Sequence, residues 1–400
     1  MPDIYIYDAL RTPCGRGDQA GSLFQIKPID LLARCLEALQ NRNELDTAQV
    51  DDALLGCVTP FGDQGDNIIK TALPYAGWSS EVPGLQLNRF QASGLEALSL
   101  AAAKIKAGWG DLIVAGGLES HSRIRRSNFR GSISSDPNII SSIGSIPSGM
   151  AADLLATLKG MERSTIDEYA IQSHTKAVEA QKIGHFQKSI IPIYDENNIL
   201  VLNRDELVNT VVDQEMMSEM ETVFPKWGRA GFEVAALKKY PLVEKINAFH
   251  TQGNIALGAD GAALVLLGNK AKGTKLGLEA KAKIVTIAAA SSDLTLMHLG
   301  GIKAAEKALK QAKLKATDID LWYTNESFAA VALHFQNHFE IDPSQFNACG
   351  STIALGEPIG AMGAMLFSIL VDELERQNLK KGLIALSAEG GMGSCMIIER

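Results

Sequence analysis

The sequence predicts an α/β fold, because short apolar segments alternate with helical segments along most of the 400 residues. The short segments are rich in β-branched or aromatic residues and are bounded by Gly, Asp or Asn, which is typical of strands buried on both faces. They are IYIYDAL, DALLGCV, DLIVAGG, AALVLLG, AKIVTIAAA, IDLWYTN and GLIALSA. Ala- and Leu-rich stretches at residues 92–108 and 304–312 have the helical spacing of apolar residues expected of elements that cover such a sheet.

A long segment from about residue 121 to residue 249 is more polar and more charged than the rest of the chain. It contains RIRRSNFRGSISSDPN, the helical pattern ERSTIDEYAIQSHTKAVEAQKIGHF and the Met- and Glu-rich DQEMMSEMETVF. Strand-like segments lie on either side of it. This arrangement predicts a partly helical loop domain that is inserted into the α/β core.

Composition excludes several classes of protein. A hydrophobic share of 46% and a charged share of 21% are sufficient for a large core divided into two or three packing units. The net charge of -8 argues against a broad nucleic-acid interface, which needs a basic surface. No uninterrupted apolar run reaches the roughly 18 residues of a membrane helix, and MPDIYIYDALRTP lacks the pattern of a signal or transit peptide.

The cysteines do not form a recognisable framework. Their number is odd, and their spacing fits neither paired disulfides nor a metal motif. They are Cys14, Cys35, Cys57, Cys349 and Cys395. This pattern predicts free thiols in a reducing compartment, which indicates a cytoplasmic protein. No metal site is expected either, because His334 and His338 have helical i, i+4 spacing but no third ligand near them in the sequence.

Two pairs of segments indicate an internal duplication. GDLIVAGGLES resembles KGLIALSAEGG, since each is a strand that runs into glycines. NRFQASGLEAL has a counterpart in FNACGSTIALGEPIGAMGAML, where another turn of small residues opens a helix of small residues. Together they suggest a repeated βαβ unit.

Several motifs, in order along the whole chain, resemble those of the thiolases. These are YDALRTPCGRG, NRFQASGLEAL, VAGGLESHSR, HTQGNIALGADGAALVLL, NESFA, GSTIALGEPIGAMGAM and AEGGMGSCMIIER. The loop-domain phrase SGMAADLLATLKGMERSTIDEYAIQSHTKAVEAQ belongs to the same resemblance. Thiolases are acetyl-CoA C-acyltransferases that make or cleave 3-ketoacyl-CoA, so the resemblance implies an acyltransferase of lipid metabolism.

The resemblance also implies an architecture and partners. The expected fold has two duplicated βαβαβαββ halves in a five-layered α-β-α-β-α arrangement, with an inserted loop domain. Residues 1–120 and 249–270 would form the N-terminal half, residues 121–248 the loop domain on the CoA side, and residues 271–400 the C-terminal half. A homodimer or homotetramer is expected, with a CoA or acyl-carrier thioester as ligand and with no cofactor, nucleic acid or membrane span required.

The chain departs from the thiolase pattern at the reacting positions. Where the family has its nucleophilic Cys before ASG, this chain has Gln91. The His of the family's GHP is replaced by Glu357, and the acid/base Cys near the C-terminus is replaced by Ser387. Asn325, in NESFA, keeps the position whose side chain orders a water in the oxyanion hole of the family.

Changes also occur where the family binds its substrate. The family's GNSS becomes GNIA, so Ile255 and Ala256 make a polar wall of the thioester site apolar. By the same resemblance, Met150, Phe328 and Gly391 are expected to line the bound thioester.

These departures change the chemistry that the site can perform. Covalent acyl transfer needs a thiolate and a base that generates it, and the carboxamide of Gln91 cannot serve as a nucleophile. An ionised Glu357 would repel a developing oxyanion, and the loss of one oxyanion donor typically costs about 2.7–4 kcal/mol. Burial in an apolar pocket would raise the pKa of Glu357 and favour the protonated form, which can donate a hydrogen bond.

Gln91 has two interpretations. In the first, its amide only satisfies nearby backbone groups and Ser387 in a retired site. In the second, the amide imitates the carbonyl of an acylated cysteine, as in decarboxylating ketosynthase-like domains of the same superfold, which carry Gln at this position but retain their histidines. Glu357 itself could be a general acid or base next to a thioester, because a carboxyl with a tuned pKa can do that work.

Three hypotheses about function follow. The chain binds a CoA or carrier thioester without Cys-dependent thiolysis or Claisen condensation, alone or beside an active thiolase-like subunit. Alternatively, it is a repurposed enzyme that uses Glu357 for decarboxylation or other acid/base chemistry on an acyl thioester. In the third, it is an active acetyl-CoA C-acetyltransferase with another nucleophile, for which Cys349 is the candidate; a small buried Cys in a turn is the alternative.

A basic cluster lies at the start of the loop domain. It comprises Arg123, Arg125, Arg126 and Arg130. A positive loop could contact the phosphates of CoA or of a carrier's pantetheine, although a solvated loop surface or a subunit contact explains the same residues.

Overall fold

The computed structural model describes residues 2–124, 131, 136–209, 212–226 and 231–400. Strands of the N-terminal part come first, and all of the segments expected to be strands in this part are strands. They are β1 (Ile4–Arg11), β2 (Gly15–Arg16), β3 (Asp52–Gly56), β4 (Gly84–Leu87), β5 (Leu112–Ser120) and β8 (Ala259–Asn269).

The strands of the C-terminal part repeat this arrangement. They are β9 (Ala282–Ser291), β10 (Leu321–Tyr323), β11 (Lys381–Ser387) and β12 (Met392–Glu399). A separate two-stranded sheet is formed by β6 (Ile193–Tyr194) and β7 (Leu200–Leu202).

The main sheet has ten strands, with the order β10-β11-β12-β9-β1-β8-β5-β3-β4 and with β2 paired to β8 at the side. In the first half, β3 is parallel to β4 and β5, whereas β8 is antiparallel to β5 and β1. In the second half, β10 is parallel to β11, whereas β12 is antiparallel to β11 and β9. The matching pattern confirms the duplication, and β5 and β11, which carry the first pair of similar segments, occupy equivalent places.

The two halves of the sheet meet along a short seam. Strands β1 and β9 pair antiparallel at two positions, Tyr5 with Lys283 and Ile6 with Ala282. Most of the connection between the halves is therefore made by helices and not by the sheet.

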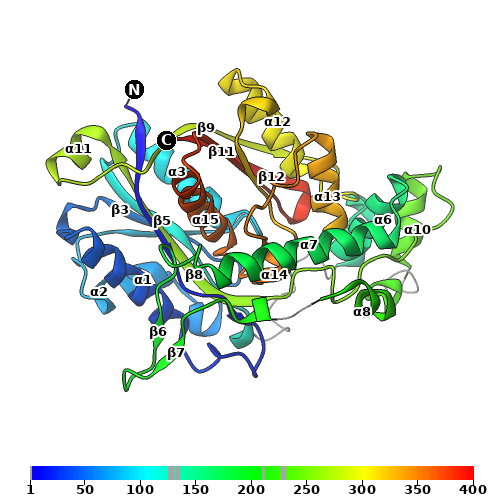
Figure 1. Ribbon diagram of the computed structural model, residues 1–400, viewed down its shortest axis with the longest axis horizontal. Coiled ribbons are helices and arrows are strands. Elements are labelled where there is room, and N and C mark those ends of the chain that lie inside the picture. The colour runs from blue at the N-terminus through cyan, green and yellow to red at the C-terminus, as the bar shows by residue number, and fades with distance from the viewer. Residues whose placement is uncertain (1, 125–130, 132–135, 210–211, 227–230) are drawn as a thin grey trace.

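Helices form the other layers. They are α1 (Pro28–Arg42), α2 (Ile68–Tyr75), α3 (Ser93–Lys106), α11 (Lys270–Lys275), α12 (Gly300–Ala312), α13 (Ala329–His338), α14 (Thr352–Leu355) and α15 (Met362–Arg376). Figure 1 shows α3 and α15 at the centre, with α1 and α2 on one side and α12 on the other. Helix α3 contacts β3, β5, β8 and β12, and α15 contacts strands of both halves. This arrangement of a mixed sheet and covering helices confirms the predicted α/β class.

Between β5 and β8 the chain forms a group of helices. They are α5 (Pro137–Ile143), α6 (Ser148–Leu158), α7 (Arg163–Lys182), α8 (Gln214–Glu219) and α10 (Phe232–Lys239). Helix α6 packs on α13, and α7 packs on α13 and α14, so the group rests on the C-terminal half. The boundaries 120/121, 248/249 and 270/271 of the expected domains stay a prediction.

One apolar stretch passes a membrane-helix test by length and composition. It is Pro137–Leu158, and 56% of its most apolar 18-residue segment is buried inside the protein. Gly144 ends α5 in a left-handed conformation before α6 begins, so the stretch is two helices. Such a stretch is weak evidence for a span.

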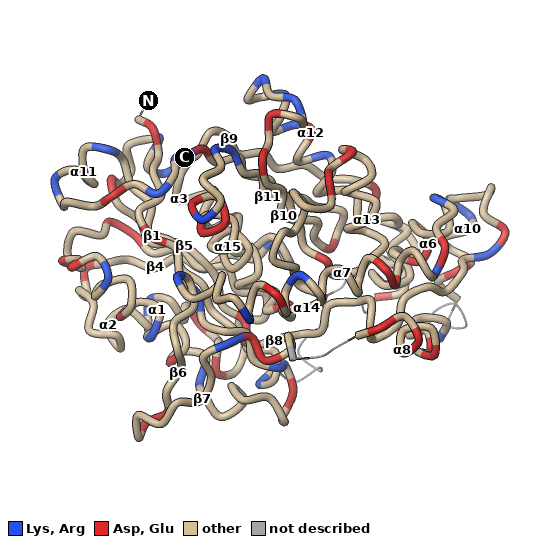
Figure 2. The backbone as a smooth tube through the Cα atoms, viewed as in Figure 1, with Lys and Arg blue, Asp and Glu red and all other residues tan. Residues whose placement is uncertain are grey.

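Charged residues of both signs are interspersed around the described chain, without an extended basic face in the view of Figure 2.

Glycines allow the central helices and the sheet to approach closely. A Cβ atom on Gly94 of α3 would lie 2.9 Å from the carbonyl oxygen of Gly360 and 3.0 Å from the nitrogen of Ala364. A Cβ on Gly117 of β5 would also collide with Gly360, and one on Gly363 would collide with Leu95. Only hydrogen fits at these positions, which is why the first turn of α3 can touch the start of α15.

Substitution of Gly94 by Ala tests this packing. Ala favours a helix over Gly by about 1 kcal/mol, but overpacking against backbone atoms costs about 1–3 kcal/mol. We therefore expect Gly94→Ala to lower the free energy of unfolding by up to about 2 kcal/mol in denaturant titrations. Gly131→Ala is the control, because its Cβ would meet nothing within 4 Å. An equal effect of the two substitutions would contradict the close-packing argument.

Candidate functional site

Gln91 lies on a tight turn that connects β4 to α3. The side chain of Asn88 accepts a hydrogen bond from the backbone nitrogen of Phe90 (2.7 Å), and the hydroxyl of Ser93 accepts one from the nitrogen of Arg89 (2.8 Å). Phe90 has a φ of 46°, a conformation that bulky residues rarely adopt. These local hydrogen bonds hold the turn and present Gln91 just before the first turn of the helix.

The carboxamide of Gln91 is bonded to the turn that follows β11. Its Oε1 accepts a hydrogen bond of 3.0 Å from the backbone nitrogen of Glu389. Gly390 and Gly391 have φ values of 72° and 79°, so this turn needs glycine to fold back toward β12. The amide oxygen of Gln91 is thus held as an acceptor facing a backbone N–H group.

Ser387 and Asn325 lock together at the end of β11. Asn325 Oδ1 accepts a hydrogen bond from the nitrogen of Ser387 (3.0 Å), and Asn325 Nδ2 donates to the carbonyl of Ser387 (3.0 Å). The hydroxyl of Ser387 donates to the carbonyl of His298 (2.7 Å) and accepts from the nitrogen of Gly301 (3.1 Å). The Ser387 side chain therefore fastens β11 to the start of α12. Gln91 was expected to bond nearby backbone groups and Ser387; the partner of its amide oxygen is a backbone group, the nitrogen of Glu389.

Glu357 is joined to the same network through Ser327. Asn325 Nδ2 donates to Ser327 Oγ (2.9 Å), and Ser327 Oγ donates to Glu357 Oε1 (2.9 Å). Both hydrogens of the Asn325 amide are consequently committed to protein acceptors, Ser327 Oγ and the carbonyl of Ser387. In this conformation Asn325 orients neighbouring side chains and has no further N–H to offer a water.

The carboxyl of Glu357 is almost fully buried, with an exposed fraction of 6%. Burial raises the pKa of Glu357 to about 7. The hydrogen bond from Ser327 lowers this pKa, and the negative charge of Glu389 raises it. Burial also raises the pKa of Glu389, whose hydrogen bond with Ser148 acts in the opposite direction. Near neutral pH the site therefore holds Glu357 about half protonated, which makes it a potential hydrogen-bond donor.

The expected substrate-binding residues lie in two places. Ile255 pairs with Phe328 in an isolated antiparallel bridge, and the nitrogen of Ala256 donates to the carbonyl of Ser327 (3.1 Å). These three residues therefore run alongside the Glu357 network. Met150 of α6 belongs to an apolar cluster against which Phe328 packs.

Gly391 is held by the segment that follows β9. Its carbonyl accepts hydrogen bonds from the nitrogen (2.7 Å) and the hydroxyl (3.1 Å) of Ser292. It fixes the turn that contacts Gln91, while its neighbour Gly390 lines the cavity described next.

A cavity of about 200 Å³ lies beside the Gln91 turn. Most of its lining is apolar, and Glu389 is its charged member. The lining residues are Phe90, Ile140, Ser145, Ile146, Pro147, Ser148, Phe232, Met297, Glu389 and Gly390. An apolar pocket with few polar groups is typical of sites for small acyl groups or ligand tails.

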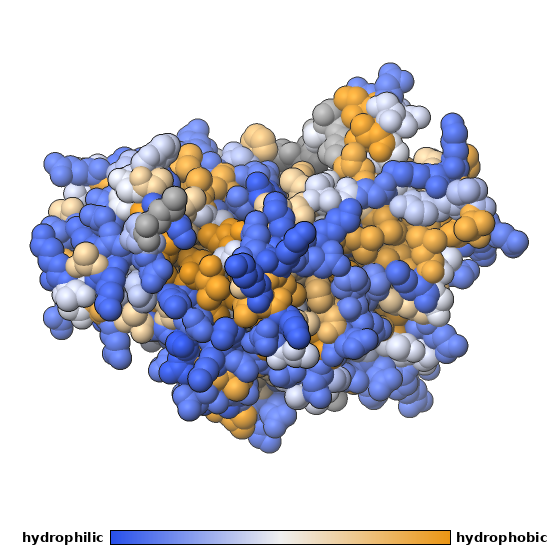
Figure 3. Space-filling model, turned by 90° about the horizontal axis from the view of Figure 1, so that it is seen from above, coloured by the Kyte–Doolittle hydropathy of each residue, from blue (hydrophilic) through white to orange (hydrophobic). Residues whose placement is uncertain are grey.

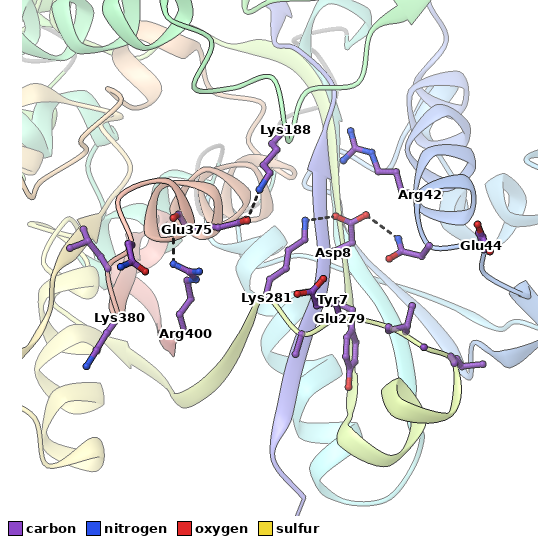
Figure 4. Close-up of a pocket in the computed structure, with 17 residues that line it drawn as sticks. Tyr7, Asp8, Arg42, Glu44, Lys188, Glu279, Lys281, Glu375, Lys380 and Arg400 are labelled. Carbon is purple, nitrogen blue, oxygen red and sulfur yellow. Dashed lines mark hydrogen bonds and ion pairs between the residues drawn. The ribbon is translucent and has the colours of Figure 1, made fainter.

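A larger hollow lies elsewhere among the described residues. Figure 4 shows this groove of about 1200 Å³ with charged side chains around it, several of which already pair with one another. Lys281 pairs with Asp8 (2.9 Å), and Lys188 pairs with Glu375 (2.6 Å). The groove includes no residue of the Gln91 network, and the positive and negative side chains that line it are nearly equal in number. It is therefore not the candidate site.

Sequence reasoning missed His298 and Glu389. The ring of His298 donates from Nε2 to the carbonyl of Ser148 (2.8 Å), and burial lowers its pKa to about 4, so it is a neutral imidazole. It packs edge-on against Phe328 with ring centroids 5.1 Å apart. Glu389 stands in the quoted AEGG motif and could have been noted there, whereas nothing in MHLGG signalled that His298 would meet Ser387.

Cys349 does not join the Gln91 network. Its sulfur lies 3.6 Å from His185 Nδ1, and its backbone nitrogen donates to the hydroxyl of Tyr323 (3.3 Å). Burial raises the pKa of its thiol, and the charge of Glu373 raises it further. The other four cysteines are buried as well, and burial raises the pKa of each of their thiols.

Arg123 is engaged by the protein. It pairs with Asp63, and its Nη1 donates to the carbonyl of Phe24 (2.7 Å). The other members of the basic cluster, Arg125, Arg126 and Arg130, lie outside the described residues. On the helix after NESFA, His338 Nε2 lies 2.8 Å from Glu306 Oε1, and its ring contacts that of His334.

Comparison with known proteins places these features in a family. The model of the thiolase N-terminal domain matches residues 4–231, and that of the thiolase C-terminal domain matches residues 278–400. The chain belongs to the thiolase family.

Relatives and a solved structure match this thiolase over its whole length. Steroid 3-ketoacyl-CoA thiolase FadA6 of Mycobacterium tuberculosis is 32% identical, over 100% of this chain and 95% of that protein. A 3-ketoacyl-CoA thiolase of Bacillus subtilis is 31% identical and an acetyl-CoA acetyltransferase of Cupriavidus necator is 32% identical, each over 100% of both chains. The crystal structure of the Bacillus anthracis acetyl-CoA acetyltransferase superposes with a TM-score of 0.85 at 28% identity, over 100% of this chain and 99% of that one.

The raised pKa of Glu357 predicts how stability depends on pH. In the folded protein the carboxyl of Glu357 stays protonated up to about pH 7, whereas in the unfolded chain it loses its proton near pH 4.5. The wild type therefore loses stability as the pH rises through this window. A shift of this size corresponds to about 3 kcal/mol. We expect Glu357→Gln to gain up to about 3 kcal/mol in unfolding free energy relative to the wild type between pH 4.5 and pH 8, measured by urea titration.

Subtracting the wild type from the variant at each pH removes the contribution of other buried carboxyls, such as Asp260 and Asp372, whose pKa values burial raises to about 6. A difference that does not change with pH would show that Glu357 titrates normally.

Proposed function

We propose that this thiolase binds an acyl thioester of CoA or of an acyl carrier at the Gln91 site and does not form a covalent acyl-enzyme. The observation that carries the proposal is the state of Gln91: a carboxamide, and not a thiol, takes the hydrogen bond from the nitrogen of Glu389. A carboxamide cannot act as the nucleophile that accepts an acyl group. The relatives' names supply the ligand class, since they act on CoA thioesters.

Alternative nucleophiles find little support. Every cysteine of the chain is buried, and burial raises the pKa of each thiol, which opposes formation of the thiolate that thiolysis requires. The hydroxyl of Ser387 already donates a hydrogen bond to the carbonyl of His298. An active acetyltransferase with a substitute nucleophile is therefore the weakest of the three hypotheses.

The binding proposal predicts affinity without acylation. Intact-mass spectrometry after incubation with acetyl-CoA or acetoacetyl-CoA should show no protein that has gained an acetyl group, and acetoacetyl-CoA should not be consumed. Calorimetry under the same conditions should register CoA-thioester binding. Gln91→Trp, which fills the turn without changing its charge, should weaken that binding. Trp109→Ala, at an exposed position three residues after α3, should not. Acylated protein would refute the proposal.

A second function is favoured by the pKa of Glu357. If the site decarboxylates a malonyl-type thioester, an ionised Glu357 would repel the substrate's carboxylate, and the pKa of about 7 means that a neutral form is available near neutral pH. The amide oxygen of Gln91, held by the nitrogen of Glu389, resembles an acyl carbonyl in a hydrogen-bonded site. Both features fit non-covalent chemistry at the carbon next to a thioester.

This second function predicts carbon dioxide release from malonyl-CoA. Release should fall by at least about tenfold in Glu357→Ala and in Gln91→Ala, since general acid–base groups typically contribute 10²–10⁴-fold. Wild-type activity should also decline above pH 7 as Glu357 ionises, whereas Glu357→Gln should lose that decline. Binding of malonyl-CoA with no carbon dioxide released would leave the binding function alone.

We also propose that the chain self-associates. Strand β4 lies at the end of the sheet, and an edge strand is a ready template for pairing with another chain. Large apolar side chains are exposed on the single chain, above all Leu242 (97%), Trp109 (77%) and Val234 (73%). Figure 3 shows apolar patches surrounded by hydrophilic residues on the face that it presents. A homodimer or homotetramer, or a complex with an active thiolase-like subunit, would cover such surface.

A further inference from the structure

Three potential metal ligands meet at a place away from the Gln91 network. His185 follows α7, Cys349 lies in the turn before α14, and Glu373 lies near the end of α15. His185 Nδ1, Cys349 Sγ and one carboxylate oxygen of Glu373 all lie within 4.8 Å of one another. Among the described residues, no other trio of His, Cys, Asp or Glu side chains brings its donor atoms together in this way.

The distances match the edges of a tetrahedral zinc site. The Cys349 sulfur lies 3.6 Å from His185 Nδ1, and that nitrogen lies 3.5 Å from Glu373 Oε1. With zinc bonds of about 2.3 Å to sulfur and about 2.0–2.1 Å to nitrogen and oxygen, a tetrahedral angle separates sulfur from nitrogen by about 3.6 Å and nitrogen from oxygen by about 3.4 Å. A cation could therefore enter with little movement of the three side chains.

A single ring nitrogen of His185 faces both the sulfur of Cys349 and the carboxylate oxygen of Glu373. Its distance of 3.5 Å from the carboxylate oxygen is longer than an ordinary N–H···O hydrogen bond. A metal ion would use the lone pair of this nitrogen and bond all three donors at once.

The surroundings of Glu373 prepare it as a ligand. Arg376 donates to both of its oxygens (2.7 Å each), and Gln377 Nε2 donates to Oε2 (2.8 Å). The carboxylate is thus fixed in direction, as carboxylate ligands of metals usually are.

The carboxylate of Glu373 lies beside the buried thiol of Cys349. A divalent ion would bind the thiolate, and the thiol proton would pass to solvent. The side chain of His185 is 17% exposed, which leaves an approach for the ion and a place for a water as the fourth ligand.

We propose that His185, Cys349 and Glu373 bind a divalent transition-metal ion of the zinc class. Cys, His and carboxylate ligands together favour zinc and its spectroscopic substitute cobalt over magnesium or calcium. The ion would tie the end of α7 to the turn before α14 and to α15. Its residues are separate from Gln91, Glu357, Ser387 and Asn325, so the proposal does not depend on the thioester site.

The test uses the full-length protein after treatment with a chelator. Titration with zinc chloride against a chromophoric competitor should show one high-affinity equivalent. Cobalt chloride should produce a thiolate-to-cobalt charge-transfer band in the near ultraviolet, which reports a sulfur ligand directly. Cys349→Ser should abolish the band and weaken zinc binding by more than about tenfold.

Controls separate loss of a ligand from loss of folding. Cys395→Ser, another buried thiol, should keep the cobalt band and the zinc affinity. His185→Asn, at a partly exposed position, should lower zinc affinity with an unchanged circular dichroism spectrum. Absence of the cobalt band in the wild type, or equal zinc binding by wild type and Cys349→Ser, would overturn the proposal.

Discussion

The close approach of α3 to the start of α15 is the constraint on which the rest of the structure depends. Because Gly94, Gly117 and Gly360 carry no side chains, backbones from both halves of the chain meet at the centre. The carboxylate of Glu119 accepts hydrogen bonds from the nitrogens of Gly360 (3.0 Å) and Val58 (3.0 Å). The contact fixes the N-terminus of α3 beside the GEPIGAMG run, so Gln91 and the Glu357 network belong to one region.

Within that region the polar groups satisfy one another. Glu357, Ser327 and Asn325 form a chain of hydrogen bonds, while Asn325 and Ser387 bond reciprocally. Networks of buried polar groups are stable only when their members are paired, because an unpaired buried group costs about 1–3 kcal/mol. Gln91, Glu357 and Ser387, which are expected to depart from the thiolase pattern, each have a hydrogen-bond partner, so they form an ordered polar cluster.

The fold could be predicted from the sequence, whereas the site could be predicted only in part. Strand segments such as DLIVAGG and GLIALSA carry their own signal in composition and in bounding residues. The partners of Ser387 carry none, because His298 is 89 residues away and meets it only through the packing of α12 on β11. The same holds for Cys349, His185 and Glu373: their sequence spacing resembles no metal motif, and tertiary structure alone assembles them. The pKa of Glu357 likewise depends on burial, which a sequence does not record.

The division of the central layer between the two halves has a consequence for synthesis on the ribosome. Helix α3 is complete at Lys106, yet α15, against which it packs, spans Met362–Arg376 of a 400-residue chain. During translation, the part of α3 that packs on α15 must stay uncovered until nearly all of the polypeptide has emerged. The nascent chain is thus a candidate client for chaperones over most of its elongation, and premature termination before α15 would release a product prone to aggregation.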